Sequence, residues 1–306
     1  MPSWNDLLTE FIAQPDDNRD AWIHARVVDA LTTIGTLRGG RRVIMYGSGF
    51  LQKPTAPPAH SMITHEDLNG LMAVIYGMEW DKGLTLILHT PGGVTNAAES
   101  LVSYMRSKFD DVEVIVPAFA MSAGTMISLA SDRIVLGRQS QLGPIDPQLS
   151  GGGRSVSARA VVEQFDRAQR EVLANTAAAH VWAPIVASLG PALLQEAQNA
   201  LDYSERMVAE WLSQYMFAGS PTSVQDGQRV AQHFNDATTH KSHGRRIGRD
   251  EARAQGVTVE DLESNQDLQE AVLSAYHLMT IVFEQTVSTK MLWSDHDRTW
   301  VKNWDE

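Results

Sequence analysis

The chain has 306 residues, 43% of them hydrophobic, which suits a globular fold with a substantial core. Its 37 acidic residues outnumber its 25 basic ones, and the resulting net charge of −12 argues against binding to a nucleic-acid phosphate backbone. Because the chain has no cysteine, disulfides, thiolate zinc sites and cysteine nucleophiles are excluded.

The N-terminal residues lack a basic segment followed by an apolar core, so they do not predict a secretory signal. No uninterrupted apolar run approaches the ~20 residues that are needed to span a bilayer. The longest candidate, residues 112–121, is interrupted by Pro117. We therefore expect a soluble protein of the cytoplasm.

The elements predicted along the first half of the chain alternate between helix and strand. Helices are expected over residues 3–14, 21–37, 64–75, 96–109 and 122–130, and strands over residues 42–50, 84–89, 112–116 and 133–136. Strands that alternate with helices predict right-handed crossovers and a mostly parallel sheet. The expected fold class is therefore α/β.

The second half of the chain is predicted to be helical. Residues 156–217 suggest several helices, and further helices are expected over residues 225–234, from about Arg249, and over 266–291, followed by a loosely held tail at 294–306. We divide the chain into N-terminal helices (residues 1–40), a catalytic core with inserted helices (41–262) and a C-terminal helix with its tail (263–306).

Two turns made of small residues follow two of the apolar strands. Pro91-Gly92-Gly93 follows the strand at 84–89, and Met121-Ser122-Ala123-Gly124 precedes a helix. Glycines allow a backbone to approach a ligand closely, and a serine at a helix N-terminus lies near unpaired N–H groups. Close helix packing alone also accounts for small residues here. Together, however, the turns would supply a nucleophilic hydroxyl and oxyanion donors, the minimum for acyl transfer.

The motifs HTPGG, AMSAGT, ASDRIVL and LGPIDPQ resemble the Clp/crotonase superfamily, and within it the serine dehydrogenase proteinase family, relatives of signal peptide peptidase A. The strongest similarity covers residues 84–149, and a weaker one extends over about residues 40–262. The resemblance implies a repeated β-β-α superhelix with a helical C-terminal extension. It also implies that Ser122 is the nucleophile of a serine peptidase, with Gly92 or Gly93 and the N–H of Ala123 as the oxyanion hole.

The general base is not fixed by the sequence. Signal peptide peptidase relatives use a downstream lysine, but this chain has no lysine between Lys108 and Lys241. The candidates are therefore His180, His240, Lys241 and His243. Any of these is equally compatible with a surface or core residue that has no catalytic role.

Asp146 lies in the segment GPIDPQ, where Pro147 restricts its backbone conformation. It could orient a catalytic histidine or fix a turn through hydrogen bonds to the backbone, and we favour the turn. His240 and His243 also form an HxxH pair, but a metal site would need further ligands, and we expect none. No GxGxxG sequence or P-loop is present, so we expect no cofactor.

Two alternatives to a peptidase stay open. A crotonase-like acyl-CoA enzyme would use the same oxyanion hole, but such enzymes place carboxylates near the reacting carbon, and no Asp or Glu lies between Pro117 and Ser131. A non-catalytic assembly module would explain the missing lysine. We expect a homo-oligomer for each of these functions. A peptidase would act on a peptide or protein substrate. Energy-driven unfolding of that substrate would need a separate ATPase, and a membrane-associated partner stays unknown.

Overall fold

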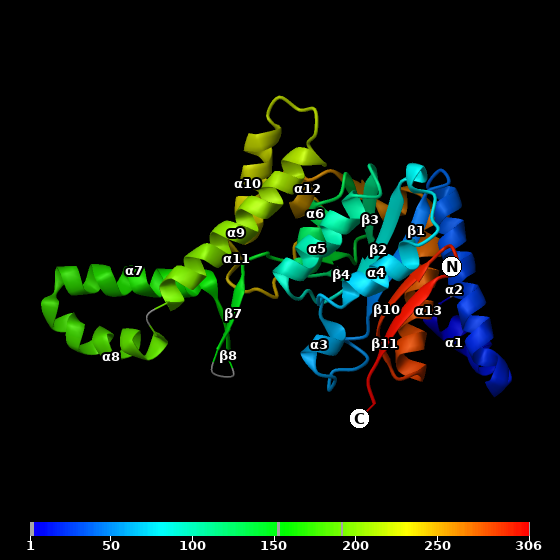
Figure 1. Cartoon of the computed structure of the whole chain (residues 1–306), viewed down its shortest axis with the longest axis horizontal. Helices are drawn as coiled ribbons and strands as arrows, with labels where there is room; N and C mark the ends of the chain where they lie inside the picture. The colour runs from blue at the N-terminus through cyan, green and yellow to red at the C-terminus, as the bar shows by residue number, and fades with distance from the viewer. Residues whose placement is uncertain (1–2, 152–153, 191, 306) are drawn as a thin grey trace. The chain divides into compact units, whose positions relative to one another are not determined.

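The structure, a computed structural model, describes residues 3–151, 154–190 and 192–305. These residues group into two compact units: unit 1 comprises residues 1–142 and 247–306, and unit 2 comprises residues 143–246. Figure 1 labels the elements of both units. The boundaries at residues 40 and 262 stay predictions, and each unit is considered by itself below.

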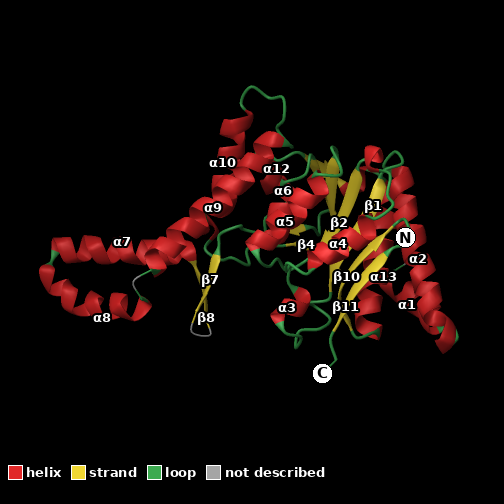
Figure 2. Cartoon of the chain, viewed as in Figure 1, coloured by secondary structure: helices red, strands yellow, loops and turns green. Residues whose placement is uncertain are grey.

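Unit 1 is built on a mixed, mostly parallel sheet, which confirms the predicted α/β class. In its described residues, seven strands pair in the order β11-β10-β1-β2-β3-β5-β9. The pairs from β1 to β9 are parallel, whereas β10 runs antiparallel to both β1 and β11 (Figure 2). These strands are β1 Arg42–Ser48, β2 Leu84–His89, β3 Val112–Val116, β5 Arg133–Leu136, β9 Val259–Asp261, β10 Ser288–Ser294 and β11 Thr299–Asn303.

Helices cover both faces of this sheet. One face packs on α1 Trp4–Ile12, α2 Arg19–Leu37 and α13 Gln266–Gln285. The crossover helices on the other face are α3 Pro58–Ser61, α4 Asp67–Ile75, α5 Thr95–Arg106 and α6 Ala123–Leu129, and α12 Arg249–Ala254 precedes β9. Two short strands, β4 Phe119–Ala120 and β6 Gln141–Leu142, pair with each other in parallel beside the main sheet. β2 and β3 are buried at every position. Strands that are covered on both faces need apolar side chains on both, which explains why these two strands are mostly apolar.

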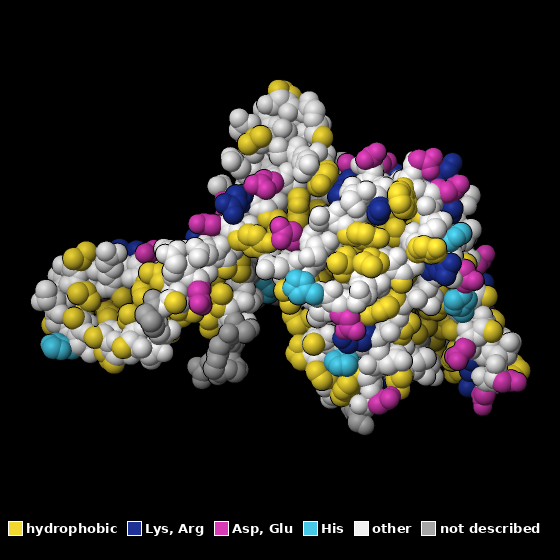
Figure 3. Space-filling view, in the orientation of Figure 1, with side chains coloured by type: hydrophobic (Ala, Val, Ile, Leu, Met, Phe, Trp, Pro, Cys, Tyr) yellow, Lys and Arg dark blue, Asp and Glu magenta, His cyan; other side chains and the backbone are white. Residues whose placement is uncertain are grey.

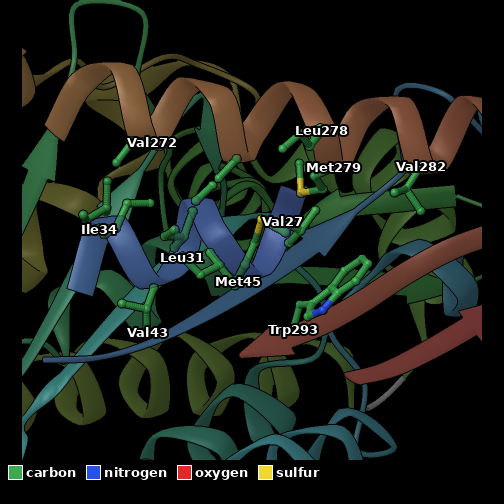
Figure 4. Close-up of a cluster of buried hydrophobic side chains, with 14 of the residues drawn as sticks. Val27, Leu31, Ile34, Val43, Met45, Val272, Leu278, Met279, Val282 and Trp293 are labelled. Atoms are coloured by element: carbon green, nitrogen blue, oxygen red, sulfur yellow. The ribbon is translucent and has the colours of Figure 1, made fainter. Parts of the chain in front are cut away.

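The main core of unit 1 lies between the sheet and the helices α2 and α13. Figure 4 shows its side chains: Val27, Leu31 and Ile34 of α2 meet Val43 and Met45 of β1, Trp293 of β10, and Val272, Leu278, Met279 and Val282 of α13. The helix residues recur at three- and four-residue spacing and the strand residues at every second position, so each element turns one apolar face inward. This core fixes the strands whose ends carry the turns described below.

The C-terminal prediction was wrong in two respects. Helix α13 ends at Gln285 instead of residue 291, and the end of the predicted helix and the expected tail instead form the hairpin of β10 and β11. Thr286, Val287 and Thr289 supply β-branched side chains that favour a strand over a helix. Every residue of β10 is buried between β1 and β11, so tertiary pairing decided the outcome.

Unit 2 is a hairpin followed by helices, in agreement with the helical character predicted for it. Its elements are β7 Gln148–Gly151, β8 Arg154–Ser157, α7 Ala158–Ala174, α8 Ala179–Leu189, α9 Leu193–Gln214, α10 Ser223–Asn235 and α11 Ala237–His240. Its cluster of buried side chains joins α7 to α9 through Ala158, Val161, Ala197 and Leu201. None of the residues of α8 is buried, and hydrophobic side chains show on the surface of α7 and α8 in Figure 3.

Helices of membrane-spanning length were sought among the described residues. No single helix there is both long enough and apolar enough to cross a bilayer. One pair of helices, Thr176–Leu189 with Leu193–Gln214, meets the length and composition test jointly, but it is bent by 67°.

Candidate active site

The two predicted turns lie side by side in unit 1. Thr90, the residue that follows β2, forms a parallel bridge with Ala120 of β4. The N–H of Thr90 donates to the carbonyl of Phe119 at 2.9 Å, and the N–H of Met121 donates to the carbonyl of Thr90 at 3.1 Å. The carboxyl ends of parallel strands meet at one edge of a sheet, where α/β proteins bind their ligands. The glycine turn and the serine turn are therefore held together by backbone pairing.

Ser122 has a backbone conformation that L-residues rarely adopt. Its φ of 51° and ψ of −115° form the sharp bend between β4 and the first residue of α6, Ala123. A non-glycine residue in this region carries strain, and such strain clusters at functional sites. The bend resembles the strand-to-helix elbow that exposes a nucleophilic serine in other hydrolase folds. Among the hydrogen bonds between described residues, none uses the Ser122 Oγ.

Gly92 lies directly against Ser122. Its φ is 101°, and a Cβ atom at this position would stand 2.7 Å from the Ser122 Cβ and 2.7 Å from the Met121 carbonyl oxygen. Only glycine fits such a contact. On the helix side, a Cβ on Gly124 would come 2.5 Å from the Thr90 Cγ2. The small residues therefore let the two turns approach until their backbones touch.

The N–H groups of the two turns differ in how they are used. The N–H of Gly92 donates to the Thr90 Oγ1 at 3.2 Å. Among the described residues, no hydrogen bond uses the N–H of Gly93 or of Ala123. Ile63 pairs with both neighbours of Gly93: its N–H donates to the Gly92 carbonyl at 2.8 Å, and its carbonyl accepts from the Val94 N–H at 3.0 Å. In a parallel ladder this pairing turns the N–H of Gly93 to the opposite side.

Within unit 2, His243 and Asp146 form a pair. The His243 Nδ1 lies 2.8 Å from the Asp146 Oδ1, and Asp146 is buried. An ionised carboxylate only accepts, so Nδ1 carries the hydrogen, and the Nε2 of the neutral ring is left as an acceptor. Gln148 donates to the other carboxylate oxygen of Asp146 at 2.8 Å and fixes its orientation. This arrangement, a carboxylate that holds one tautomer of a histidine, is the base half of a catalytic triad.

The other base candidates lack such a partner. His240 is buried, and both of its ring nitrogens are occupied: Nε2 by the His233 carbonyl at 2.6 Å and Nδ1 by the Arg245 guanidinium at 3.0 Å. His180 is exposed on α8, and Lys241 is exposed just after α11. Of the four candidates, only His243 combines a carboxylate with a ring nitrogen that is left as an acceptor.

A histidine that the sequence did not single out lies immediately before the glycine turn. His89, the last residue of β2, is fully buried among the rings of Phe50, Phe119 and Tyr276. Neither of its ring nitrogens has a hydrogen-bond partner, and burial lowers the pKa of His89 to about 3. This histidine is therefore neutral across the physiological range.

Two further charged residues near the glycine turn were also missed. Asp67, at the start of α4, and Lys290, on β10, are fully buried and lie 2.5 Å apart. Lys290 was hidden because residues 266–291 were predicted to be one helix. Asp67 lies in the first turn of a helix, where an acidic residue is common and carries no specific signal.

Comparisons with known proteins give one family match. A family model described as ClpP-like SDH-type serine proteinase matches residues 4–179. Two uncharacterized proteins of Methanocaldococcus jannaschii are similar. One is 41% identical over 92 residues (30% of this chain and 32% of that protein), and the other is 32% identical over 119 residues (39% of each). The chain thus spans between about a third and two fifths of these relatives.

Among solved structures, a mutant of a membrane-bound stomatin-specific protease is similar to this chain. It is 17% identical, with a TM-score of 0.36, and the match covers 65% of this chain and 74% of that one.

Proposed function

The chain belongs to the family of ClpP-like SDH-type serine proteinases, and from that premise we propose that it hydrolyses peptide bonds through an acyl-enzyme on Ser122. The observation that carries this proposal is the strained backbone of Ser122, with Gly92 packed against it. A hydroxyl raised on such a bend at the start of a helix is accessible to a substrate carbonyl. The positive end of the α6 dipole favours the developing negative charge.

In the proposed reaction, the Ser122 Oγ attacks the peptide carbonyl carbon while His243 takes the hydroxyl proton on Nε2. The carbonyl oxygen becomes an oxyanion, which the N–H groups of Gly93 and Ala123 stabilise. Collapse of the tetrahedral intermediate breaks the C–N bond, and His243 returns the proton to the leaving amine. Water then attacks the acyl-enzyme with His243 as base again, which frees the new carboxyl end and restores Ser122.

The oxyanion role favours Gly93 over Gly92. The N–H of Gly92 already donates to Thr90, whereas hydrogen bonds between described residues leave those of Gly93 and Ala123 unused. A donor that is already oriented and unpaired needs no reorganisation when the charge develops.

The test compares three variants for hydrolysis of an unfolded fluorescent protein and for labelling by a fluorophosphonate. Ser122→Ala should abolish labelling and lower turnover by about 10³-fold or more. His243→Ala should have a similar effect because it removes the base. His180→Ala removes an exposed histidine on α8 and should behave like the wild type.

Two outcomes would contradict the proposal. Normal turnover by Ser122→Ala would exclude the nucleophile. If His243→Ala were fully active while His180→Ala were inactive, the base would be misassigned. A wild-type protein that folds but is neither labelled nor active would favour a non-catalytic assembly role.

A further inference from the structure

A lysine with no exposed surface anchors the segment that pairs with the glycine turn. The Nζ of Lys290, on β10, lies 2.5 Å from the Asp67 Oδ1, 2.8 Å from the Met62 carbonyl and 3.5 Å from the Thr64 Oγ1. An ammonium group has three hydrogens to donate, and here each has an acceptor. All three acceptors belong to the short stretch from Met62 to Asp67.

Asp67 connects this lysine to the rest of the sheet. Its Oδ2 accepts a hydrogen bond from the Tyr46 hydroxyl at 2.8 Å and another from the Thr64 N–H at 2.9 Å. Tyr46 lies on β1, so the cluster joins β1, β10 and the start of α4. Both charged groups are taken out of water, which is tolerated only when each is paired and hydrogen-bonded.

The residue between the two anchored ones touches the oxyanion turn. Ile63, flanked by Met62 and Thr64, exchanges two backbone hydrogen bonds with Gly92 and Val94. A Cβ on Gly93 would stand only 2.3 Å from the Ile63 carbonyl oxygen and 2.4 Å from its nitrogen. The backbones of Gly93 and Ile63 are therefore in direct contact, so a displacement of Ile63 moves Gly93 as well.

We propose that Lys290, paired with Asp67, is a positioning residue that holds the N–H of Gly93 where the oxyanion forms. Lys290 fixes the carbonyl of Met62 and the hydroxyl of Thr64, and these flanks fix Ile63. The Ile63 N–H donates to the Gly92 carbonyl and so fixes the plane of the Gly92–Gly93 peptide, while the Ile63 carbonyl accepts from the Val94 N–H and fixes the next peptide. This inference rests on the proposed peptidase function, because it assigns a role to the same oxyanion site.

A purely structural role for the ion pair makes a different prediction. Removing one partner of a buried ion pair is destabilising, because the other charge is left buried without a counterion. A structural pair would therefore change the thermal midpoint when it is removed, but not the turnover of the protein that remains folded. A positioning pair would lower kcat in folded protein and leave KM nearly unchanged, since the oxyanion contact exists only in the transition state.

The chain offers a matched control for Lys290→Met. Lys302, on β11, lies opposite Lys290 in the β10–β11 register and forms an ion pair with Glu66. Both lysines reach toward the same segment. Among the described residues, the Lys302 ammonium contacts this segment at the Glu66 carboxylate, outside the stretch from Met62 to Thr64. Lys302→Met therefore removes the same charge from the neighbouring strand without releasing Ile63.

The experiment measures kcat and KM, together with the rate of fluorophosphonate labelling. For Lys290→Met we expect kcat and the labelling rate to fall by about tenfold to a hundredfold, with KM within about twofold of the wild type. Lys302→Met should match the wild type in all three. Equal kcat for Lys290→Met and the wild type, in active protein, would overturn the proposal.

Lys290→Met leaves Asp67 buried without its counterion, so a second variant guards against misfolding. The double variant Lys290→Met/Asp67→Asn removes both charges, while the new amide oxygen can still accept from Tyr46 and Thr64. It should fold, and its kcat should stay low because the contact with the Met62 carbonyl is still absent. Wild-type kcat in this folded double variant would also overturn the proposal.

Hydrogen exchange provides a readout that does not depend on activity. The amides of Ile63 and Val94 should exchange about tenfold faster or more in the Lys290 variants than in Lys302→Met, while β2 and β3 stay protected. Unchanged exchange at these two amides would disprove the mechanical link. If instead the exchange changes as expected but the wild type shows no hydrolysis or labelling, the proposed function fails and the anchoring stands.

Discussion

At the scale of single residues, the candidate site depends on pairs whose members hold each other in one geometry. Asp146 holds the His243 ring through its Nδ1. Gly92 lies so close to Ser122 that a side chain at position 92 would not fit. In each pair, one residue carries the proposed chemistry and the other limits its freedom. The cost of losing the second residue should therefore appear in turnover.

Asp146→Asn tests the first of these pairs. The amide keeps the shape of the carboxylate but loses its charge, so the imidazolium formed during catalysis is less stable and the wrong ring tautomer becomes accessible. We expect kcat to fall by about 10²-fold to 10⁴-fold. Steady-state kinetics on the unfolded protein substrate provide the measurement.

The control for this substitution is Asp236→Asn in the same unit. Asp236 accepts from the Thr238 N–H at the start of α11, and asparagine caps a helix about as well as aspartate, so the change should leave stability and kcat nearly unaltered. A similar loss of kcat in both variants would argue against an orienting role for Asp146.

At the scale of elements, the site is made by two strand–turn–helix units held together through their backbones. β2 leads into the glycine turn and α5, and β4 leads into the serine turn and α6. Thr90 bridges to Ala120 within this arrangement, and Ile63 pairs with the far side of the glycine turn. Because each segment is fixed by its neighbour, a change in one turn is transmitted to the other.

Gly92→Ala tests the contact between the turns. The new methyl group would meet Ser122 at a distance that no real Cβ tolerates, in a backbone conformation with positive φ. We expect fluorophosphonate labelling to slow by about 10²-fold, along with a clear drop in the thermal midpoint. Gly39→Ala is the matched control, because Gly39 also has a positive φ, of 81°, but nothing lies within 4 Å of its Cβ position.

Gly39→Ala should cost only the conformational strain, about 1 kcal/mol, with labelling unchanged. If Gly92→Ala were labelled as fast as Gly39→Ala, the close approach of the two turns would have no bearing on Ser122.

At the scale of the whole molecule, buried ionisable groups make stability depend on pH. His89 is held neutral, with its pKa lowered from 6.5 to about 3 by burial. Burial raises the pKa of Glu113, but hydrogen bonds from Arg38 and Thr85 outweigh it and leave that pKa below 4.5. Both folded pKa values lie below the unfolded ones, so the unfolded chain binds more protons in acid. Stability is therefore full above about pH 6.5 and is lost as the pH falls.

His89→Phe separates the two contributions. Between pH 6.5 and pH 4.5, His89 alone should remove about 2 kcal/mol from the free energy of unfolding of the wild type. The variant keeps only the smaller slope that comes from His277, whose pKa burial also lowers. Below pH 4.5 it loses further stability, as Glu113 takes up a proton more readily in the unfolded chain than in the folded protein. Urea titrations across this range measure the difference, with His180→Phe as an exposed-histidine control that keeps the wild-type slope. A wild-type slope in His89→Phe would exclude His89 as the source.

Much of the fold of unit 1 could be predicted because its signals are local. The mostly apolar strands at residues 84–89, 112–116 and 133–136 are confirmed, as are the helices between them, to within a few residues. The short strands β4, β6 and β9 were not predicted, because two or three residues carry no periodicity. The hairpin of β10 and β11 was predicted to be helix and tail. The apolar run from Met291 to Trp293 is too short to distinguish the two-residue period of a strand from the 3.6-residue period of a helix.

The candidate site was predictable only where its residues are neighbours in sequence. The turns at Gly92 and Ser122 are marked by small residues that follow strands, so composition and order suffice to propose them. The base candidates His180, His240, Lys241 and His243 could not be ranked, because the partner of a histidine is a matter of three-dimensional contact. Asp146 was favoured as a turn residue, yet it lies against His243, 97 positions away.

The sequence by itself determined the family, the alternation of strands and helices, and the two small-residue turns, since all of these are set by residues within one short segment. Only the tertiary structure decided that the Gly93 N–H finds no partner among the described residues, that His243 has a carboxylate, and that Lys290 reaches Met62. These facts depend on strand register and on contacts between distant segments. Local propensity does not encode them, because they arise only when the sheet has assembled and its core is packed.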